Sequence, residues 1–136
     1  MIAHSEWKQG EVFEGVTESG NTVTIDADSA HKHGPSPMEA VLMALCACTS
    51  VDVVSILQKK RQSLTGLRVT ATATQAPAPP RVFTHISLTY AVRGKLSRKA
   101  VEDAVSLSKN KYCSVSKMLE KAAQIDYIIE YSNDSS

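Results

Sequence analysis

The chain has 136 residues, which is the length of one typical domain, and its formal net charge is +1 at pH 7. A charge so close to zero excludes the broad basic surface that binding to nucleic acid or to an anionic membrane requires, so neither is expected as a partner. The 3 cysteines are not preceded by an apolar leader segment, and we expect a cytoplasmic protein whose thiols are reduced at rest.

The N-terminal region, residues 1–33, is predicted to contain short strands and a loop. A Glu-Ser-Gly-Asn segment at 18–21 lies between two patterned runs and is typical of a hairpin turn. Residues 27–34 are polar and predict a loop. Its His31 and His33 belong to no recognisable metal-binding motif, so we expect no metal and no other cofactor. The predicted strands are residues 2–9, 12–17 and 22–26.

A long apolar segment, residues 36–61, predicts the central helix of the fold. Ser36 suits the N-cap, Pro37 the first helical position and Glu39 the third, which together form a capping box. The segment is nearly long enough to cross a membrane, but its acidic and hydroxyl residues favour a buried core helix. A helix that is apolar nearly all round needs cover on every side, which one short chain cannot supply. We therefore expect a homodimer with a shared core.

The second half of the chain is predicted to hold a β-hairpin, two helices and a last strand. Apolar and polar residues alternate on both sides of a proline-rich loop at 76–80, which is typical of paired strands. Ser97 and Ser114 suit the N-caps of the two helices, and the tail 133–136 is expected to fray. The predicted regions are the hairpin 66–93, with strands 67–74 and 82–92, and the region 97–131, with helices 97–108 and 114–121 and a strand 124–131.

The cysteines are the residues best suited to carry chemistry. Cys46 and Cys48 point about 200° apart on a helix, so they cannot easily bridge each other or share a metal. Cys113 precedes a predicted helix, whose free N–H groups favour a thiolate. All three could instead be small core residues, as buried free cysteines usually are.

Four further residues could support a reactive thiol. Asp52 lies one turn from Cys48 on the same helix face, where a bare carboxylate would blunt the thiol. Activation would need a cation, for which Lys111, Arg81 or a histidine are candidates. If Asp52 faces the core, we expect it to meet a cation, a hydroxyl or a backbone N–H group, or else to be protonated. Glu39 could act as a general base, although its capping role accounts for it.

Several blocks of the sequence resemble the OsmC/Ohr family, and more specifically its YhfA-type branch. They are GPSPME at 34–39, CTSVDVVSIL at 48–57, RVFTHI at 81–86 and KYCSV at 111–115. The order of elements, βββ-α-ββ-αα-β, agrees from end to end, so residues 1–136 are expected to form a single OsmC-like domain. The resemblance implies an α+β fold in which antiparallel sheets wrap the central helix in an intertwined homodimer.

The resemblance also implies a function. Cys48 would attack a hydroperoxide and become a sulfenic acid, and Cys113 would resolve it as a disulfide that an unknown thiol reductant reopens. This chain departs from the peroxidase pattern, because Met38 stands where a glutamate follows the helix-starting proline and no arginine precedes Arg61. The expected function is a thiol-dependent peroxidase of oxidative-stress defence. A non-catalytic small-molecule binding or redox-sensing dimer on the same scaffold remains the alternative.

Overall fold

The computed structural model describes residues 1–133. These residues form two compact units, one of residues 1–43 and one that begins at Ala44, and each is described by itself. The boundary falls inside the long helix α1, Pro37–Lys59. The expected fraying of the tail from 134 on lies outside the described residues.

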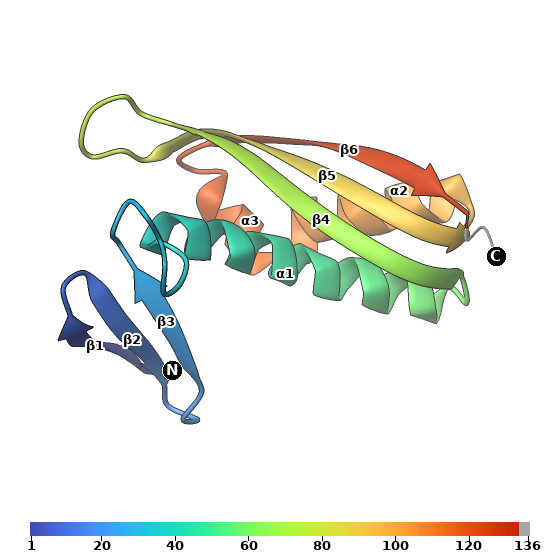
Figure 1. Ribbon diagram of the computed structural model, residues 1–136. Coiled ribbons are helices and arrows are strands. Elements are labelled where there is room, and N and C mark those ends of the chain that lie inside the picture. Colours follow the sequence, from blue (N-terminus) through green and yellow to red (C-terminus); the bar gives the residue numbers. More distant parts are fainter. Residues whose placement is uncertain (134–136) are drawn as a thin grey trace. The chain divides into compact units, whose positions relative to one another are not determined.

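The first unit is built on an antiparallel sheet with the strand order β1-β2-β3 (Figure 1). The predicted turn at 18–21 is confirmed: Thr17 and Asn21 close it with a backbone hydrogen bond of 2.9 Å, and Gly20 has a φ of 89°, which suits glycine. Gly34 passes so close to the carbonyl group of Thr24 that a Cβ atom would clash with it. The strands are Ala3–Gln9, Val12–Thr17 and Thr22–Asp26.

Both ends of α1 are fixed by specific caps. At the start, the backbone N–H of Ser36 donates to Glu39 Oε1 at 2.9 Å and the N–H of Glu39 donates to Ser36 Oγ at 3.1 Å, which confirms the capping box. At the end, Arg61 takes a left-handed φ of 55°, and the N–H of Gln62 reaches back to the carbonyl of Leu57. This Schellman motif ends the helix at Lys59, two residues earlier than the sequence predicted, because arginine here takes the place of the usual glycine.

The second unit contains a three-stranded sheet with the order β4-β5-β6. The predicted antiparallel pairing is confirmed for β4 and β5, but β6 pairs with β5 in parallel, because the chain returns through the helical segment to the starting end of β5. The strand predicted to begin at residue 67 begins earlier, at Ser63, so Gly66 lies inside β4 at a register shift. Such a bulge is a common place for a glycine within a strand. The strands are Ser63–Gln75, Phe83–Lys95 and Gln124–Ser132.

The core of the second unit lies between this sheet and the helices on one of its faces, which are α1 and α2, Arg98–Leu107 (Figure 1). Alternate residues of β5 are buried, as the period of two predicted, and they meet one face of each helix. The least exposed apolar side chains are Leu45, Val53 and Leu57 of α1, Ile86, Leu88, Tyr90 and Val92 of β5, and Val101, Ala104 and Val105 of α2.

The segment after α2 differs from its prediction. The sequence predicted separate helices over 97–108 and 114–121, but the chain continues between them as a π-helix, η1, Ser108–Tyr112. The N–H of Cys113 donates to the carbonyl of Ser108 at 2.7 Å. The short helix α3, Ser114–Leu119, follows directly. Its N-cap is Cys113 rather than the predicted Ser114, because the sulfur of Cys113 accepts the N–H of Ser116.

Candidate functional site

Two cysteines that are far apart in the sequence come together in the second unit. Cys48 lies on α1 and is partly buried, whereas Cys113 lies between η1 and α3 and is fully buried. The Cys48 thiol is near enough to raise the pKa of Cys113, and neither thiol is in a disulfide. The fold thus brings together the two thiols that the family resemblance pairs.

The environment of Cys113 favours its protonated form. Burial raises the pKa of Cys113 to about 11, and the neighbouring Cys48 thiol and Asp52 carboxylate act in the same direction. The backbone N–H of Ser116, 3.4 Å from the sulfur, acts against them. The helix-start effect that the sequence predicted is therefore present, but desolvation outweighs it. At neutral pH, Cys113 is a thiol.

A chain of hydroxyl groups starts at Asp52, beside the two thiols. Ser108 Oγ donates to Asp52 Oδ2 at 2.8 Å, which confirms that Asp52 has a hydroxyl partner. Ser108 Oγ also lies 2.8 Å from Thr49 Oγ1, which in turn lies 2.7 Å from Tyr90 Oη. Thr49, Ser108 and Tyr90 are fully buried. No buried side-chain nitrogen or oxygen atom of residues 1–133 lacks a hydrogen-bond partner.

The donors and acceptors of this chain fix its direction. Each hydroxyl has one proton, and that of Ser108 goes to Asp52, so Thr49 donates to Ser108 and Tyr90 donates to Thr49. Burial raises the pKa of Tyr90 to about 12, although its hydrogen bond with Thr49 lowers it. Tyr90 is therefore a neutral phenol at the far end of a chain whose protons all point towards Asp52.

The π-helix η1 positions both the hydroxyl group beside Asp52 and the thiol beside Cys48. Its first residue, Ser108, donates a hydrogen bond to Asp52, and the residue after its last, Cys113, lies near enough to Cys48 for that thiol to raise its pKa. A π-turn holds one more residue than an α-turn, and such turns occur frequently at functional sites. The irregular segment thus aims two side chains, five residues apart, at the same face of α1.

A cavity of about 550 Å³ opens beside Asp52 within the second unit. Its other walls are mostly apolar, and two lysines add positive charge to its lining. Asp52 is therefore reachable from the cavity as well as from the hydroxyl chain. The lining residues are Asp52, Ser55, Ile56, Lys59, Lys60, Leu107 and Tyr112.

The other residues proposed from the sequence make different contacts. Arg81 lies exposed in the loop between β4 and β5, where its Nε donates to the carbonyl of Ala76 at 3.3 Å. Lys111 is exposed, and its Nζ lies 5.4 Å from the centre of the Tyr112 ring. Glu39 is engaged in the capping box. Burial raises the pKa of Cys46, against a backbone hydrogen bond from Ala71 of β4, so Cys46 faces the sheet.

Sequence reasoning missed three members of the site. Thr49 is one of several hydroxyl residues in an apolar helix, Tyr90 fits the strand pattern as an ordinary core residue, and Ser108 falls at an ordinary helix end. None of them belongs to a motif. The one available signal is a threonine on the same helix face as the core residues Leu45 and Val53, which indicates a buried hydroxyl that needs a partner.

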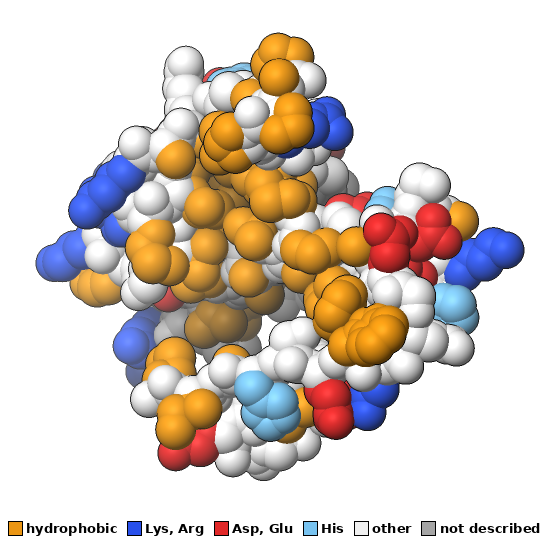
Figure 2. Space-filling view, turned by 90° about the vertical axis from the view of Figure 1, so that its left-hand side faces the viewer, with side chains coloured by type: hydrophobic (Ala, Val, Ile, Leu, Met, Phe, Trp, Pro, Cys, Tyr) orange, Lys and Arg blue, Asp and Glu red, His pale blue; other side chains and the backbone are white. Residues whose placement is uncertain are grey.

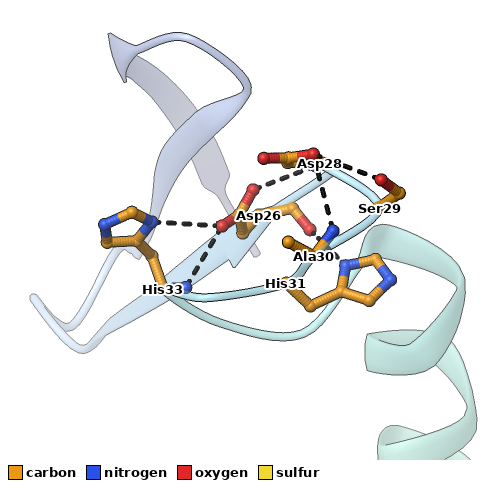
Figure 3. Close-up of polar contacts among 6 residues, drawn as sticks. All are labelled: Asp26, Asp28, Ser29, Ala30, His31 and His33. Carbon is orange, nitrogen blue, oxygen red and sulfur yellow. Dashed lines mark hydrogen bonds and ion pairs between the residues drawn. The ribbon is translucent and has the colours of Figure 1, made fainter.

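A separate polar cluster lies in the first unit, around the buried carboxylate of Asp26 (Figure 3). Asp26 Oδ1 accepts the N–H of Asp28 at 2.9 Å, and Oδ2 accepts the N–H of His33 at 3.1 Å and lies 3.2 Å from His33 Nδ1. His31 Nδ1 lies 3.1 Å from the carbonyl oxygen of Asp26. The two histidines therefore brace their own loop. Within residues 1–133, no group of three or more His, Cys, Asp or Glu side chains is arranged to hold a metal ion.

This cluster predicts a loss of stability in acid. The N–H of Asp28 above all, with the N–H and imidazole of His33, holds the pKa of Asp26 below its usual value. A carboxyl whose pKa is lower in the folded state than in the unfolded state stabilises the fold at pH values above its unfolded-state pKa. This stabilisation is lost as the pH falls through the folded-state pKa. Urea unfolding should show that Asp26→Asn is less stable than the parent at pH 7, with the difference shrinking towards pH 3. A difference that stays constant over that range would contradict this.

A comparison with known proteins shows the family. The family model for OsmC-like proteins matches residues 28–128. Protein YhfA of Escherichia coli strain K12 is 47% identical over 131 residues, which cover 96% of this chain and 97% of YhfA. The chain belongs to the OsmC-like family. The resemblance to the OsmC/Ohr family and its YhfA-type branch is thus confirmed.

Solved structures agree with this assignment. A hypothetical protein from Aquifex aeolicus VF5 superposes with a TM-score of 0.83 at 29% identity, covering 96% of each chain. An organic hydroperoxide resistance protein OsmC from Legionella pneumophila superposes with a TM-score of 0.71 at 16% identity, covering 95% of each chain. The predicted fold class, α+β with two sheets and a central helix, is confirmed for this member of the OsmC-like family.

Proposed function

We propose that this OsmC-like protein is a thiol-dependent peroxidase of oxidative-stress defence, which reduces organic hydroperoxides through Cys48 and Cys113. The Cys48 thiolate attacks one peroxide oxygen, the O–O bond breaks, and the other oxygen leaves as an alcohol after taking up a proton. Cys48 becomes a sulfenic acid. Cys113 attacks its sulfur, water leaves, and a disulfide forms. A thiol reductant then returns both cysteines to the reduced state.

The observation that carries this proposal is the proximity of a partly exposed thiol, Cys48, to a buried one, Cys113, whose pKa it raises. Cys48 is partly exposed, so a hydroperoxide can contact its sulfur, and Cys113 is a nearby buried thiol that is protonated at neutral pH. A sulfenic acid that has a neighbouring thiol is converted to a disulfide before it is oxidised further. The Legionella neighbour is named an organic hydroperoxide resistance protein, which agrees with this chemistry at the level of the shared fold.

The proposed enzyme is a cytoplasmic homodimer. An 18-residue window of α1 has a mean hydropathy of 2.2, yet only 22% of it is buried within one chain. By length and composition such a helix could cross a membrane, but a core helix passes the same test. Figure 2 shows hydrophobic side chains at the surface, and Met43 and Val51 of α1 are 59% and 67% exposed. A second copy that covers α1 accounts for this exposure without a membrane.

The alternative is a non-catalytic dimer that binds a small molecule or senses oxidants. It is favoured by the missing activating groups, since Met38 replaces the expected glutamate and the N-terminal strands contain no arginine. The candidate replacements Arg81 and Lys111 make other contacts. The cavity beside Asp52 would then hold the ligand.

Peroxide consumption by cysteine variants separates the two functions. With cumene hydroperoxide and dithiothreitol, we expect Cys48→Ser to lose consumption to the uncatalysed level, because it lacks the attacking sulfur. Cys113→Ser is expected to complete one rapid turnover and to accumulate Cys48 sulfenic acid, which dimedone labels. Peptide mapping of the oxidised parent should show a Cys48–Cys113 disulfide.

Cys46→Ser serves as the matched control, because Cys46 lies on the same helix and faces the sheet. It should consume peroxide at the parent rate and form the same disulfide. If Cys48→Ser consumes peroxide as fast as Cys46→Ser, the enzymatic function is wrong. Binding of a ligand in the cavity then becomes the leading function.

A further inference from the structure

Asp52 occupies a position that the two cysteines alone do not explain. It lies one helical turn from Cys48 on the same face of α1, and its charge acts on Cys113. Only its Oδ2 atom accepts a hydrogen bond, from Ser108. Within residues 1–133, Oδ1 has no hydrogen-bond partner. A carboxylate oxygen with free lone pairs therefore lies beside two thiols that must exchange a proton.

We infer that Asp52 is the acid–base group that closes the Cys48–Cys113 disulfide. This inference rests on the proposed function. In the step Cys48–SOH + Cys113–SH → Cys48–S–S–Cys113 + H2O, Asp52 takes the proton from the Cys113 thiol as its sulfur attacks Cys48. Asp52 then gives that proton to the departing hydroxyl group, which leaves as water. The carboxylate is regenerated, and no further oxidant or base is consumed.

The chemistry of the step requires such a group. Cys113 is fully buried and protonated at neutral pH, so almost none of it is present as the attacking thiolate. A sulfenic acid also loses hydroxide poorly unless a proton is supplied. One carboxylate beside both thiols meets both needs. The hydrogen bond from Ser108 holds Oδ2 of Asp52 in place, which leaves Oδ1 free to accept a proton.

Other titratable or charged groups near Asp52 are less suited to this role. Tyr90 is reached only through two hydroxyl groups, and burial raises its pKa to about 12, so it does not accept a proton from a thiol. The remaining groups that line the cavity are Lys59 and Lys60 of the α1 end and Tyr112 of η1. Lys60 pairs with Asp103 at 3.6 Å, and a protonated lysine has no lone pair with which to accept a proton.

The test is the rate of disulfide closure, measured separately from the rate of sulfenic acid formation. Rapid mixing with one equivalent of cumene hydroperoxide, followed by timed alkylation, counts free thiols and disulfides. We expect Asp52→Asn to close the disulfide about 100-fold more slowly than the parent, the lower range for loss of a general acid–base group. Glu102→Gln, an exposed acid-to-amide change on α2, should close at the parent rate.

Two readouts distinguish proton transfer from a structural effect. In the parent, closure should be independent of pH through the neutral range. In Asp52→Asn it should rise about tenfold per pH unit, because the rate then follows the Cys113 thiolate fraction. In Asp52→Ala, added formate should restore closure in proportion to its concentration, since the cavity of about 550 Å³ beside Asp52 admits so small a carboxylate.

The outcomes are distinct. If Cys113→Ser forms no sulfenic acid, the proposed peroxidase function fails and this inference fails with it. If sulfenic acid forms at the parent rate but Asp52→Asn closes within threefold of the parent, the inference alone is wrong. Slow closure with a flat pH profile and no formate effect would reduce Asp52 to a structural role and overturn it.

Ser108→Ala keeps the test valid if the Asp52 variants do not fold. This change keeps the carboxylate and removes its hydrogen-bond donor. Without that donor the carboxylate is no longer held beside the two thiols, so closure should be at least about tenfold slower than in the parent. A closure profile identical to that of the parent would contradict the role of Asp52.

Discussion

Replacing Val51 by lysine is expected to convert the protein from a dimer to a monomer at micromolar concentration. The Val51 side chain is 67% exposed in the single chain, although it lies in the middle of the apolar helix α1. If a second copy covers α1, the substitution buries an unpaired ammonium group at a cost of several kcal/mol. Since about 1.4 kcal/mol is tenfold in affinity, the dimer dissociation constant should rise about 1000-fold or more.

Sedimentation at several protein concentrations measures this change. The parent should sediment as a dimer, and its unfolding midpoint should rise with protein concentration, whereas a monomer shows no such dependence. Ile128→Lys is the matched control. Ile128 of β6 is 60% exposed. Its side chain lies on the opposite face of the strand from the buried Ile125, so it points away from the helices. A Val51→Lys protein that still sediments as a dimer would rule out α1 as the centre of the interface.

The sequence predicted most elements of the fold because their signals are local. The capping box at Ser36 and Glu39 involves residues that are neighbours in the chain, and the alternation along β5 needs only one buried face. The helix end at Arg61 and the bulge at Gly66 were missed for the opposite reason. A left-handed arginine and a glycine inside a strand are decided by how the chain continues into β4, which a local pattern does not contain.

The site was less predictable because tertiary contacts create it. The pairing of Cys48 with Cys113 came from the family resemblance, and nothing in their spacing requires it. That Asp52 would need a partner followed from burial, but the choice of Ser108 depends on the π-helix, which local propensity does not reveal. Burial raises the pKa of Cys113, and the N–H of Ser116 at the helix start lowers it by a smaller amount. The sequence indicated only the helix start, because the depth of burial depends on the fold.

Replacing Thr49 by valine is expected to cost the fold about 2–3 kcal/mol of unfolding free energy, although the two side chains have nearly the same shape. Thr49 is fully buried, and its hydroxyl joins Tyr90 Oη at 2.7 Å to Ser108 Oγ at 2.8 Å. Valine would leave the Tyr90 hydroxyl with no acceptor and Ser108 with one donor fewer. A buried polar group left unsatisfied costs about 1–3 kcal/mol.

Urea unfolding at one fixed protein concentration measures this cost, with Thr72→Val as the control. Thr72 is exposed on β4, and a surface change of this kind should shift the unfolding free energy by no more than about 0.5 kcal/mol. Tyr90→Phe removes the hydroxyl group that Thr49→Val leaves without an acceptor. The double variant should therefore be more stable than Thr49→Val alone. A Thr49→Val protein as stable as Thr72→Val would mean that the hydroxyl chain does not hold α1, β5 and η1 together.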